Sequence, residues 1–168
     1  TTRLAMPEIK IGLFPDCGAT WFFSRLPHYL ARFISLTGAT LNSADVLFAG
    51  LAEHGIAHPE KQAVIAALET AQDWDRPHRT VGRILAAAEQ HSPAADTADS
   101  RLMAAAPAIR EAARGSDLGD IVAGLTGLAE THDDWLAESA GNLAAGCPTT
   151  AHLIHDQLET GRYLSLAQ

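Results

Sequence analysis

The chain has 168 residues, and its 12 Lys and Arg residues against 20 Asp and Glu residues give a formal net charge of −8 at pH 7. A hydrophobic content of 47% excludes general disorder, and the acidic balance disfavours a surface for nucleic acid or anionic membranes. No apolar run reaches the roughly 18 residues of a membrane-spanning helix. The two cysteines, Cys17 and Cys147, have no metal-like spacing and favour a reducing compartment, so we predict a cytoplasmic protein.

The opening segment is the one part of the chain that we expect to be extended. It is bounded by Pro7 and by a Pro-Asp-x-Gly turn at residues 15–18. Thr1-Thr2-Arg3 leads directly into it, so we expect no signal peptide and expect the chain to begin inside a longer protein. Its apolar residues partly alternate, which is typical of a strand: Leu4, Met6, Ile9, Ile11, Leu13 and Phe14.

From residue 16 onward the chain is predicted to be helical. Apolar residues recur at helical spacing over residues 21–36, with Pro27 as a break between two helices and Gly38 as the end of the second. Ser43 is predicted to cap a short helix that stops at Gly50. Residues 51–57 form a brief strand or an extended crossing, and Pro59 begins a helix over residues 59–71.

The second half is also predicted to be helical, with its least regular part at residues 72–101. There we expect a short helix over 80–89 and an exposed loop in the polar tract 92–100. Pro107 is expected to open one helical segment, and Ser116-Asp117 to cap the next. A further helix follows His132-Asp133-Asp134 and runs to about residue 145, before Thr149 or Thr150 caps a final helix that ends near Gly161.

Two carboxylates lie eight residues apart in the opening segment, in Met6-Pro7-Glu8 and in Gly12-Leu13-Phe14-Pro15-Asp16-x-Gly18. A strand that ends in such a turn before a helix can place an acid at the mouth of a pocket. Glu8 can then activate water as a general base or attack a carbonyl carbon directly, although a solvated charge is the usual state of a glutamate. Asp16 precedes a helix, so it can equally be an N-cap.

These two motifs resemble the enoyl-CoA hydratase/isomerase (crotonase) superfamily, and within it the branch of 3-hydroxyisobutyryl-CoA hydrolases. The resemblance implies an α/β crotonase-like fold, of which this chain is a mostly α portion. Residues 1–58 would end the ββα spiral core, and residues 59–168 would form the helical C-terminal region with an irregular loop near 90–100. The resemblance continues in later fragments: Leu36-Thr37-Gly38, Ala44-Asp45, Ala49-Gly50-Leu51-Ala52, His54, Cys147-Pro148-Thr149-Thr150 and Gln157-Leu158-x-x-Gly161.

The resemblance also implies the chemistry. Glu8 would be the catalytic glutamate that faces the thioester, and Asp16 would bind the substrate's 3-hydroxyl or position water. The reaction would be hydrolysis of 3-hydroxyisobutyryl-CoA in valine catabolism, with coenzyme A as part of the substrate and no other cofactor. Donors for the oxyanion would come from two loops that precede the Pro-Glu motif. The C-terminal helices would mediate homo-oligomer contacts.

Three further residues are candidates for substrate binding, each with a structural alternative. Phe14 and Trp21 can line an acyl pocket, although core packing at a helix start explains them equally well. Gly12 serves backbone geometry or a close approach to the substrate. Beside hydrolysis, two alternatives stay open: hydration or isomerisation of an enoyl-CoA by the same fold, and a non-catalytic helical fragment that serves assembly.

For the other candidate groups we predict structural roles. Cys17 adjoins a carboxylate that would raise its pKa, so we interpret it as a buried, inert thiol. His152 and His155 lie three residues apart on a predicted helix but have no evident third metal ligand. His54 and His58 flank a glycine in a crossing segment and are predicted to be structural.

Overall fold

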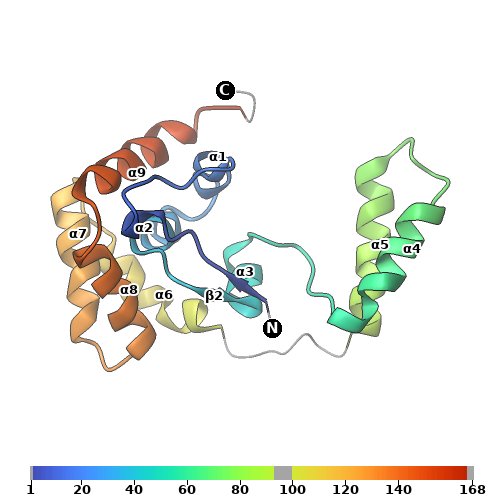
Figure 1. The fold of residues 1–168 in the computed structure, drawn as a ribbon, viewed down its shortest axis with the longest axis horizontal. Helices are drawn as coiled ribbons and strands as arrows, with labels where there is room; N and C mark the ends of the chain where they lie inside the picture. The colour runs from blue at the N-terminus through green and yellow to red at the C-terminus, as the bar shows by residue number, and fades with distance from the viewer. Residues whose placement is uncertain (1, 93–99, 166–168) are drawn as a thin grey trace.

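The computed structural model describes residues 2–92 and 100–165, which form helices joined by loops and one small two-stranded sheet (Figure 1). None of the helices in these two ranges is long and apolar enough to cross a membrane. The α-helices are α1 (Ala19–Phe23), α2 (His28–Thr37), α3 (Ser43–Ala49), α4 (Lys61–Thr70), α5 (Pro77–His91), α6 (Arg101–Ala112), α7 (Leu118–Gly127), α8 (Asp134–Ala144) and α9 (Pro148–Gly161). Short 3₁₀ turns are η1 (Glu8–Lys10), η2 (His58–Glu60) and η3 (Leu128–Glu130).

Helix α2 is the centre of the fold, and α6, α8 and α9 pack around it (Figure 1). All of its residues from Leu30 to Thr37 are buried, including the polar ones. When a helix is buried on every side, its polar side chains must find hydrogen-bond partners on the neighbouring elements. Arg32 accordingly donates to the carbonyl oxygens of Ala113 at 2.8 Å and Gly115 at 3.0 Å, and lies 3.3 Å from a carboxylate oxygen of Glu159.

The prediction of an extended opening segment is wrong beyond its first residues. Only Arg3–Leu4 (β1) is a strand, paired antiparallel with Leu41–Asn42 (β2). Because Pro7 has no N–H to donate, the pairing is not continued, and the chain turns into η1 instead. Ile11 is then left 69% exposed on the outside of the turn, so the apolar pattern of this segment marks surface and core residues alike.

Several predicted helix boundaries are confirmed. Pro27 separates α1 from α2, and Gly38 and Gly50 end α2 and α3 in the left-handed conformation that glycine tolerates. Asp117 caps α7 by accepting from the Asp120 amide, and Asp133 caps α8 by accepting from the Trp135 and Leu136 amides. These signals act over three or four residues, which is why the sequence reveals them.

Other boundaries differ from the prediction. Asn42, rather than Ser43, caps α3, because Asn42 and Asp45 form a reciprocal capping box. Pro107 does not open a helix but lies exposed inside α6, and α9 begins after Cys147 with Pro148 in its first turn, so neither Thr149 nor Thr150 is its cap. Helix α5 is longer than predicted, and residues 51–57 contain no strand. Most of the predicted 92–100 loop lies outside the described residues.

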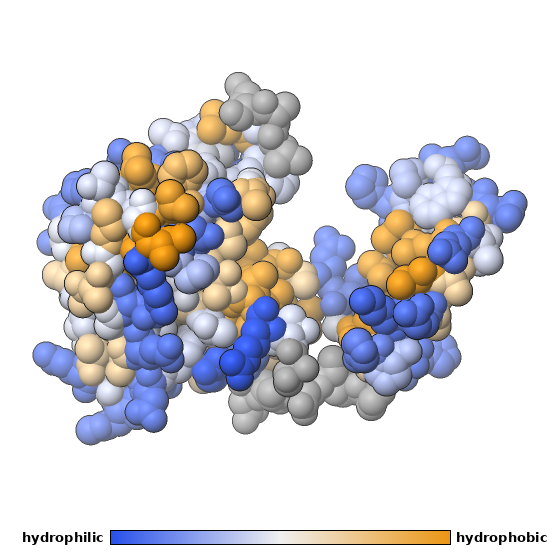
Figure 2. Space-filling model, in the orientation of Figure 1, coloured by the Kyte–Doolittle hydropathy of each residue, from blue (hydrophilic) through white to orange (hydrophobic). Residues whose placement is uncertain are grey.

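Helices α4 and α5 form a hairpin that lies apart from the other helices (Figure 1). Hydrogen bonds attach the hairpin to the crossing segment that precedes it in the chain. The carboxylate of Glu89 accepts from the Gly55 amide at 2.9 Å and lies 2.9 Å from Nδ1 of His54, while Ser92 Oγ accepts from the Ala57 amide. His54 is therefore structural, as predicted. Apolar residues gather on the hairpin where it faces the other helices (Figure 2).

Asp45 joins the starts of α3 and α6. Its side chain is 0% exposed and accepts hydrogen bonds from Asn42 N, Ser100 Oγ and Leu102 N. Replacement Asp45→Ala leaves three donors unsatisfied, so we expect it to lower the free energy of unfolding by about 3 kcal/mol. The matched control Asp117→Ala removes an exposed cap and should cost about 1 kcal/mol. Urea unfolding of both variants measures this difference, and equal losses would contradict the bridging role.

The attachment of the hairpin should respond to acid. The hydrogen bond to His54 and the Gly55 amide lower the pKa of Glu89 below its ordinary value of 4.5. A lowered carboxyl pKa means that this interaction is intact above pH 4.5 and is lost as the pH falls through the lower, folded-state value. We expect the Gly55 amide proton resonance to titrate with a midpoint below 4.5, and the titration to vanish in Glu89→Gln but persist in Glu69→Gln. A midpoint at or above 4.5 would be the wrong sign.

Candidate functional site

The segment that carries Glu8 is seated between two glycines from distant parts of the chain. A Cβ at Gly38 would lie 3.0 Å from Cα of Pro7, and a Cβ at Gly146 would lie 2.6 Å from Cγ1 of Ile9. The side chain of Ile9 is fully buried, and its carbonyl oxygen accepts from the Cys147 amide at 3.1 Å. The end of α2 and the α8–α9 connection therefore fix the position of η1 by close backbone approach.

Glu8 is the first residue of η1, and its side chain is half-buried. Its backbone carbonyl accepts from the amides of Ile11 and Leu13, which closes a turn through Gly12 at a φ of 76°. Its Oε2 atom is buried and has no hydrogen-bond partner among the described residues. A buried carboxylate oxygen without a partner is costly, and such exceptions often mark sites that act on a ligand or water.

Asp16 lies exposed after the turn and is not the cap of α1. Gly18 occupies the cap position at a φ of 81°, without a side-chain hydrogen bond, and only the backbone carbonyl of Asp16 accepts from Ala19. The hydrogen bond and charge of Asp16, with burial and the charge of Glu8, raise the pKa of Cys17. The two predicted acids thus act on the same thiol, which places them in one neighbourhood.

The prediction that Cys17 is buried is wrong, because its side chain is exposed. It has a φ of 52°, and this left-handed turn directs the chain toward α1. The prediction relied on the residue type, because a free cysteine is usually buried. The raised pKa nevertheless agrees with the expectation of low reactivity at neutral pH.

The remaining predicted binding residues differ in accessibility. Phe14 is 41% exposed beside the exposed Leu13, so it offers apolar surface next to the two acids. Trp21 is half-buried, and one face of its ring is covered by the guanidinium of Arg25 at 4.0 Å from the ring centroid. Phe14 is therefore more accessible than Trp21, and Gly12 provides the left-handed turn between Glu8 and Phe14.

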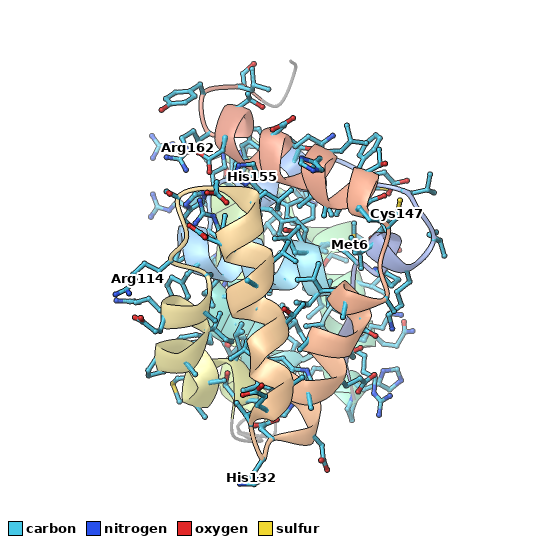
Figure 3. The ribbon with its side chains drawn as sticks, turned by 90° about the vertical axis from the view of Figure 1, so that its left-hand side faces the viewer. Met6, Arg114, His132, Cys147, His155 and Arg162 are labelled. Atoms are coloured by element: carbon cyan, nitrogen blue, oxygen red, sulfur yellow. The ribbon has the colours of Figure 1, made fainter. Side chains whose placement is uncertain are left out.

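A cavity of about 370 Å³ lies between α7, α8 and α9. Cys147, which lines this cavity, also lies beside the segment that carries Glu8, because its sulfur is 4.0 Å from the position that a Cβ would occupy at Gly12 (Figure 3). None of the predicted site residues Glu8, Gly12, Phe14, Asp16 and Trp21 lines this cavity, and the spacing of the two acids does not predict it. Its lining is mostly apolar: Leu118, Gly119, Val122, Leu143, Ala144, Gly146, Cys147, Pro148, Ala151 and His152.

His152 and His155 lie on α9, but within residues 2–92 and 100–165 no group of three or more His, Cys, Asp or Glu side chains could hold a metal ion. The donors that this part of the chain offers near Glu8 are carboxylates and a thiol. Groups of these types can act as acids and bases.

Comparison with known proteins identifies the family. The sequence profile of the enoyl-CoA hydratase/isomerase family matches residues 1–168. The chain belongs to this family. Its fold is also that of a crystal structure of a carnitinyl-CoA dehydratase from Mycobacterium thermoresistibile, with a TM-score of 0.75 and 30% identity over 99% of this chain and 45% of that one. The mostly helical structure is thus part of a crotonase-like fold, as predicted.

Two plant relatives show how the family has diverged. A probable 3-hydroxyisobutyryl-CoA hydrolase 3 from Arabidopsis thaliana is 48% identical over 69 residues, 41% of this chain and 17% of the relative. The small ribosomal subunit protein mS47 from the same plant is 49% identical over 53 residues, 32% of this chain and 13% of that protein. The chain spans less than half the length of these family members.

The close packing around the segment that carries Glu8 can be tested by replacing glycines with alanine. Gly146→Ala forces a Cβ against Ile9, so we expect a loss of about 1–3 kcal/mol in the free energy of unfolding. Gly141→Ala is the matched control, because Gly141 lies shortly before Gly146, within α8, and a Cβ there meets no atom within 4 Å. That control should be stabilising by about 0.5–1 kcal/mol, since alanine favours a helix over glycine. The free energy of unfolding of both variants, measured with a chemical denaturant, tests this. A loss in Gly146→Ala alone indicates close packing against Ile9, whereas equal changes in both variants would indicate a general effect of alanine.

Proposed function

We propose that this chain carries the acidic side of the active site of a hydrolase for short 3-hydroxyacyl-CoA thioesters, with 3-hydroxyisobutyryl-CoA as the first candidate substrate. The proposal depends mainly on Glu8, whose buried Oε2 has no partner among the described residues. The exposed Asp16 lies in the same neighbourhood, and Phe14 adds apolar surface beside them. The similarity to a probable 3-hydroxyisobutyryl-CoA hydrolase supports this choice of substrate.

Glu8 would provide the reacting carboxylate by one of two routes. As a general base it would take a proton from water while the water oxygen attacks the thioester carbon. As a nucleophile it would form an acyl-anhydride, which water then hydrolyses. In both routes the C–S bond breaks and the coenzyme A thiolate leaves, to be protonated by solvent. In both routes the negative charge that develops on the thioester oxygen needs hydrogen-bond donors.

Asp16 would bind the 3-hydroxyl of the substrate or orient the attacking water. A carboxylate that projects from a tight turn is held in place by the backbone, because the Asp16 carbonyl is fixed by the Ala19 amide. An ionised carboxylate has two acceptor oxygens and can accept a hydrogen bond from a hydroxyl group in exchange for one from water. Coenzyme A would enter with the substrate, and the proposed reaction needs no further cofactor.

Two other functions have specific support. The 30% identity with the carnitinyl-CoA dehydratase favours addition or removal of water at an enoyl thioester. The 49% identity with the ribosomal protein mS47 favours a role in assembly without catalysis. The identity to the hydrolase is nearly equal to that of mS47, so similarity alone does not choose between them.

The test is thiol release from 3-hydroxyisobutyryl-CoA by the protein and by its Glu8→Gln variant. We expect the variant to lose about 10²–10⁴-fold in kcat, because the reacting carboxylate is replaced by an amide of the same shape. Glu130→Gln in η3 is the matched control, since Glu130 is exposed and distant in sequence, and it should retain full activity. Unfolding curves of all three proteins show whether any loss has a structural origin.

The outcomes separate the three functions. Release that survives Glu8→Gln would disprove the assignment of Glu8. A change in ultraviolet absorbance from a conjugated enoyl thioester, without thiol release, would indicate hydratase chemistry. Full folding with neither reaction, and no binding of the thioester, would favour the assembly role.

A further inference from the structure

The hairpin formed by α4 and α5 has almost no hydrophobic core of its own. Its buried apolar residues are Ile84 and Ala88, both on α5, whereas α4 has no buried residue. Neither of them belongs to the core that α2 shares with α6, α8 and α9. Two short helices bury too little apolar surface to be stable alone, because helices in proteins draw most of their stability from tertiary packing. The hairpin therefore needs a partner surface that the other described helices do not supply.

The outer side of α4 is available for such a partner. Figure 1 shows the hairpin apart from the other helices, and the helix that packs against α4 is α5. The half-buried residues of α4 recur at helical spacing and mark the side toward α5: Val64, Ala67 and Leu68. On the other side Ile65 is 38% exposed, beside the exposed Ala66. Apolar residues accordingly gather at the surface of the hairpin (Figure 2).

The charges on this exposed side are arranged symmetrically about Ile65. Lys61, Ile65 and Glu69 follow each other at intervals of four residues, so they lie along one ridge of α4, and all three are exposed. The cation lies about 6 Å before Ile65 along the helix axis, and the carboxylate about 6 Å after it. Neither charge forms an ion pair within residues 2–92 and 100–165. Such a ridge is complementary to itself, because reversing its direction exchanges the two charges.

The hairpin also lacks the excess of negative charge that the rest of the chain carries. Residues 61–91 contain four Lys or Arg and four Asp or Glu side chains, so their formal net charge is zero. The formal charge of −8 therefore lies entirely outside the hairpin. A neutral surface offers little attraction to a strongly charged partner, whereas two copies of the chain can meet there without strong repulsion. This balance favours a second copy as the partner.

We propose that α4 is a self-association surface, at which two copies of this chain pair through their hairpins as a two-fold symmetric, antiparallel four-helix bundle. Ile65 meets the partner's Ile65 at the two-fold axis. Lys61 then lies opposite the partner's Glu69, and Glu69 lies opposite the partner's Lys61. In a parallel pairing like charges would face each other, so the ridge selects the antiparallel orientation.

The size of α4 sets the strength of this contact. The helix has ten residues and is about 15 Å long. Two hairpins of this length bury less than the roughly 1,200 Å² of a standard stable interface, so we expect a Kd on the order of 10–100 µM. The pairing does not depend on the hydrolase chemistry, because α4 contains none of the residues proposed to act on the thioester.

The test is sedimentation equilibrium of the full chain at low ionic strength, where exposed charges are least screened. We expect Lys61→Glu and Glu69→Lys each to raise Kd about tenfold, because each change turns two attractive contacts of the dimer into two repulsive ones. A mixture of the two variants should associate at least as tightly as the unchanged protein. In that mixed dimer every acidic residue of one ridge faces a lysine of the other.

The same series controls for folding and for net charge. An acid at the start of α4 and a base near its end both suit the helix dipole, so the circular dichroism of both variants should show no loss of helix. Glu138→Lys, on the exposed side of α8, changes the net charge as Glu69→Lys does and should leave Kd unchanged.

Three results would overturn the proposal. The first is an unchanged protein that remains monomeric at about 1 mM, far above the expected Kd, which would point to a different polypeptide as the partner of this surface. The second is a Glu69→Lys variant that associates as tightly as Glu138→Lys. The third is a failure of the two α4 variants to associate with each other, which would contradict the antiparallel pairing about Ile65.

Discussion

The burial of α2 on every side is the constraint on which the rest of the described structure depends. Its apolar residues are enclosed by α6, α8 and α9, and Phe33 meets Trp135 edge-on with ring centroids 5.4 Å apart. Its one buried cation, Arg32, donates from Nη1 to two carbonyl groups that follow α6. A buried charge must be paired in this way, so the partners of Arg32 fix how α6 and α9 sit against α2.

The position of Glu8 follows from this packing. Because α2 is held in place, its terminal glycine, Gly38, presents a fixed surface to Pro7, and Gly146 closes the other side against Ile9. The acid is therefore placed by the approach of distant backbones rather than by a sheet. Its unpartnered oxygen breaks the rule that buried polar atoms are satisfied, and natural proteins tend to break such rules at functional sites.

The two cysteines show how the same side chain acquires opposite properties. Cys17 lies next to a carboxylate, which disfavours its thiolate, whereas Cys147 lies against the amides at the start of α9, which favour it. The family membership predicts neither environment, since a fold supports different chemistries through local changes. The same reasoning applies to relatives that bear the names of a hydrolase, a dehydratase and a ribosomal protein.

The sequence by itself determined what depends on near neighbours. Pro27 and Gly38 act within one turn of helix, so the limits of α2 followed from residue type, and the two acids were recognisable from their motifs. Only the tertiary structure decided that the opening segment is mainly a 3₁₀ turn, that Cys17 is exposed, and that Cys147 borders a cavity. The opening segment is fixed by contacts of Ile9 with Gly146 and Cys147, more than a hundred positions away, and the cavity arises where three helices pack together. No local pattern encodes either arrangement.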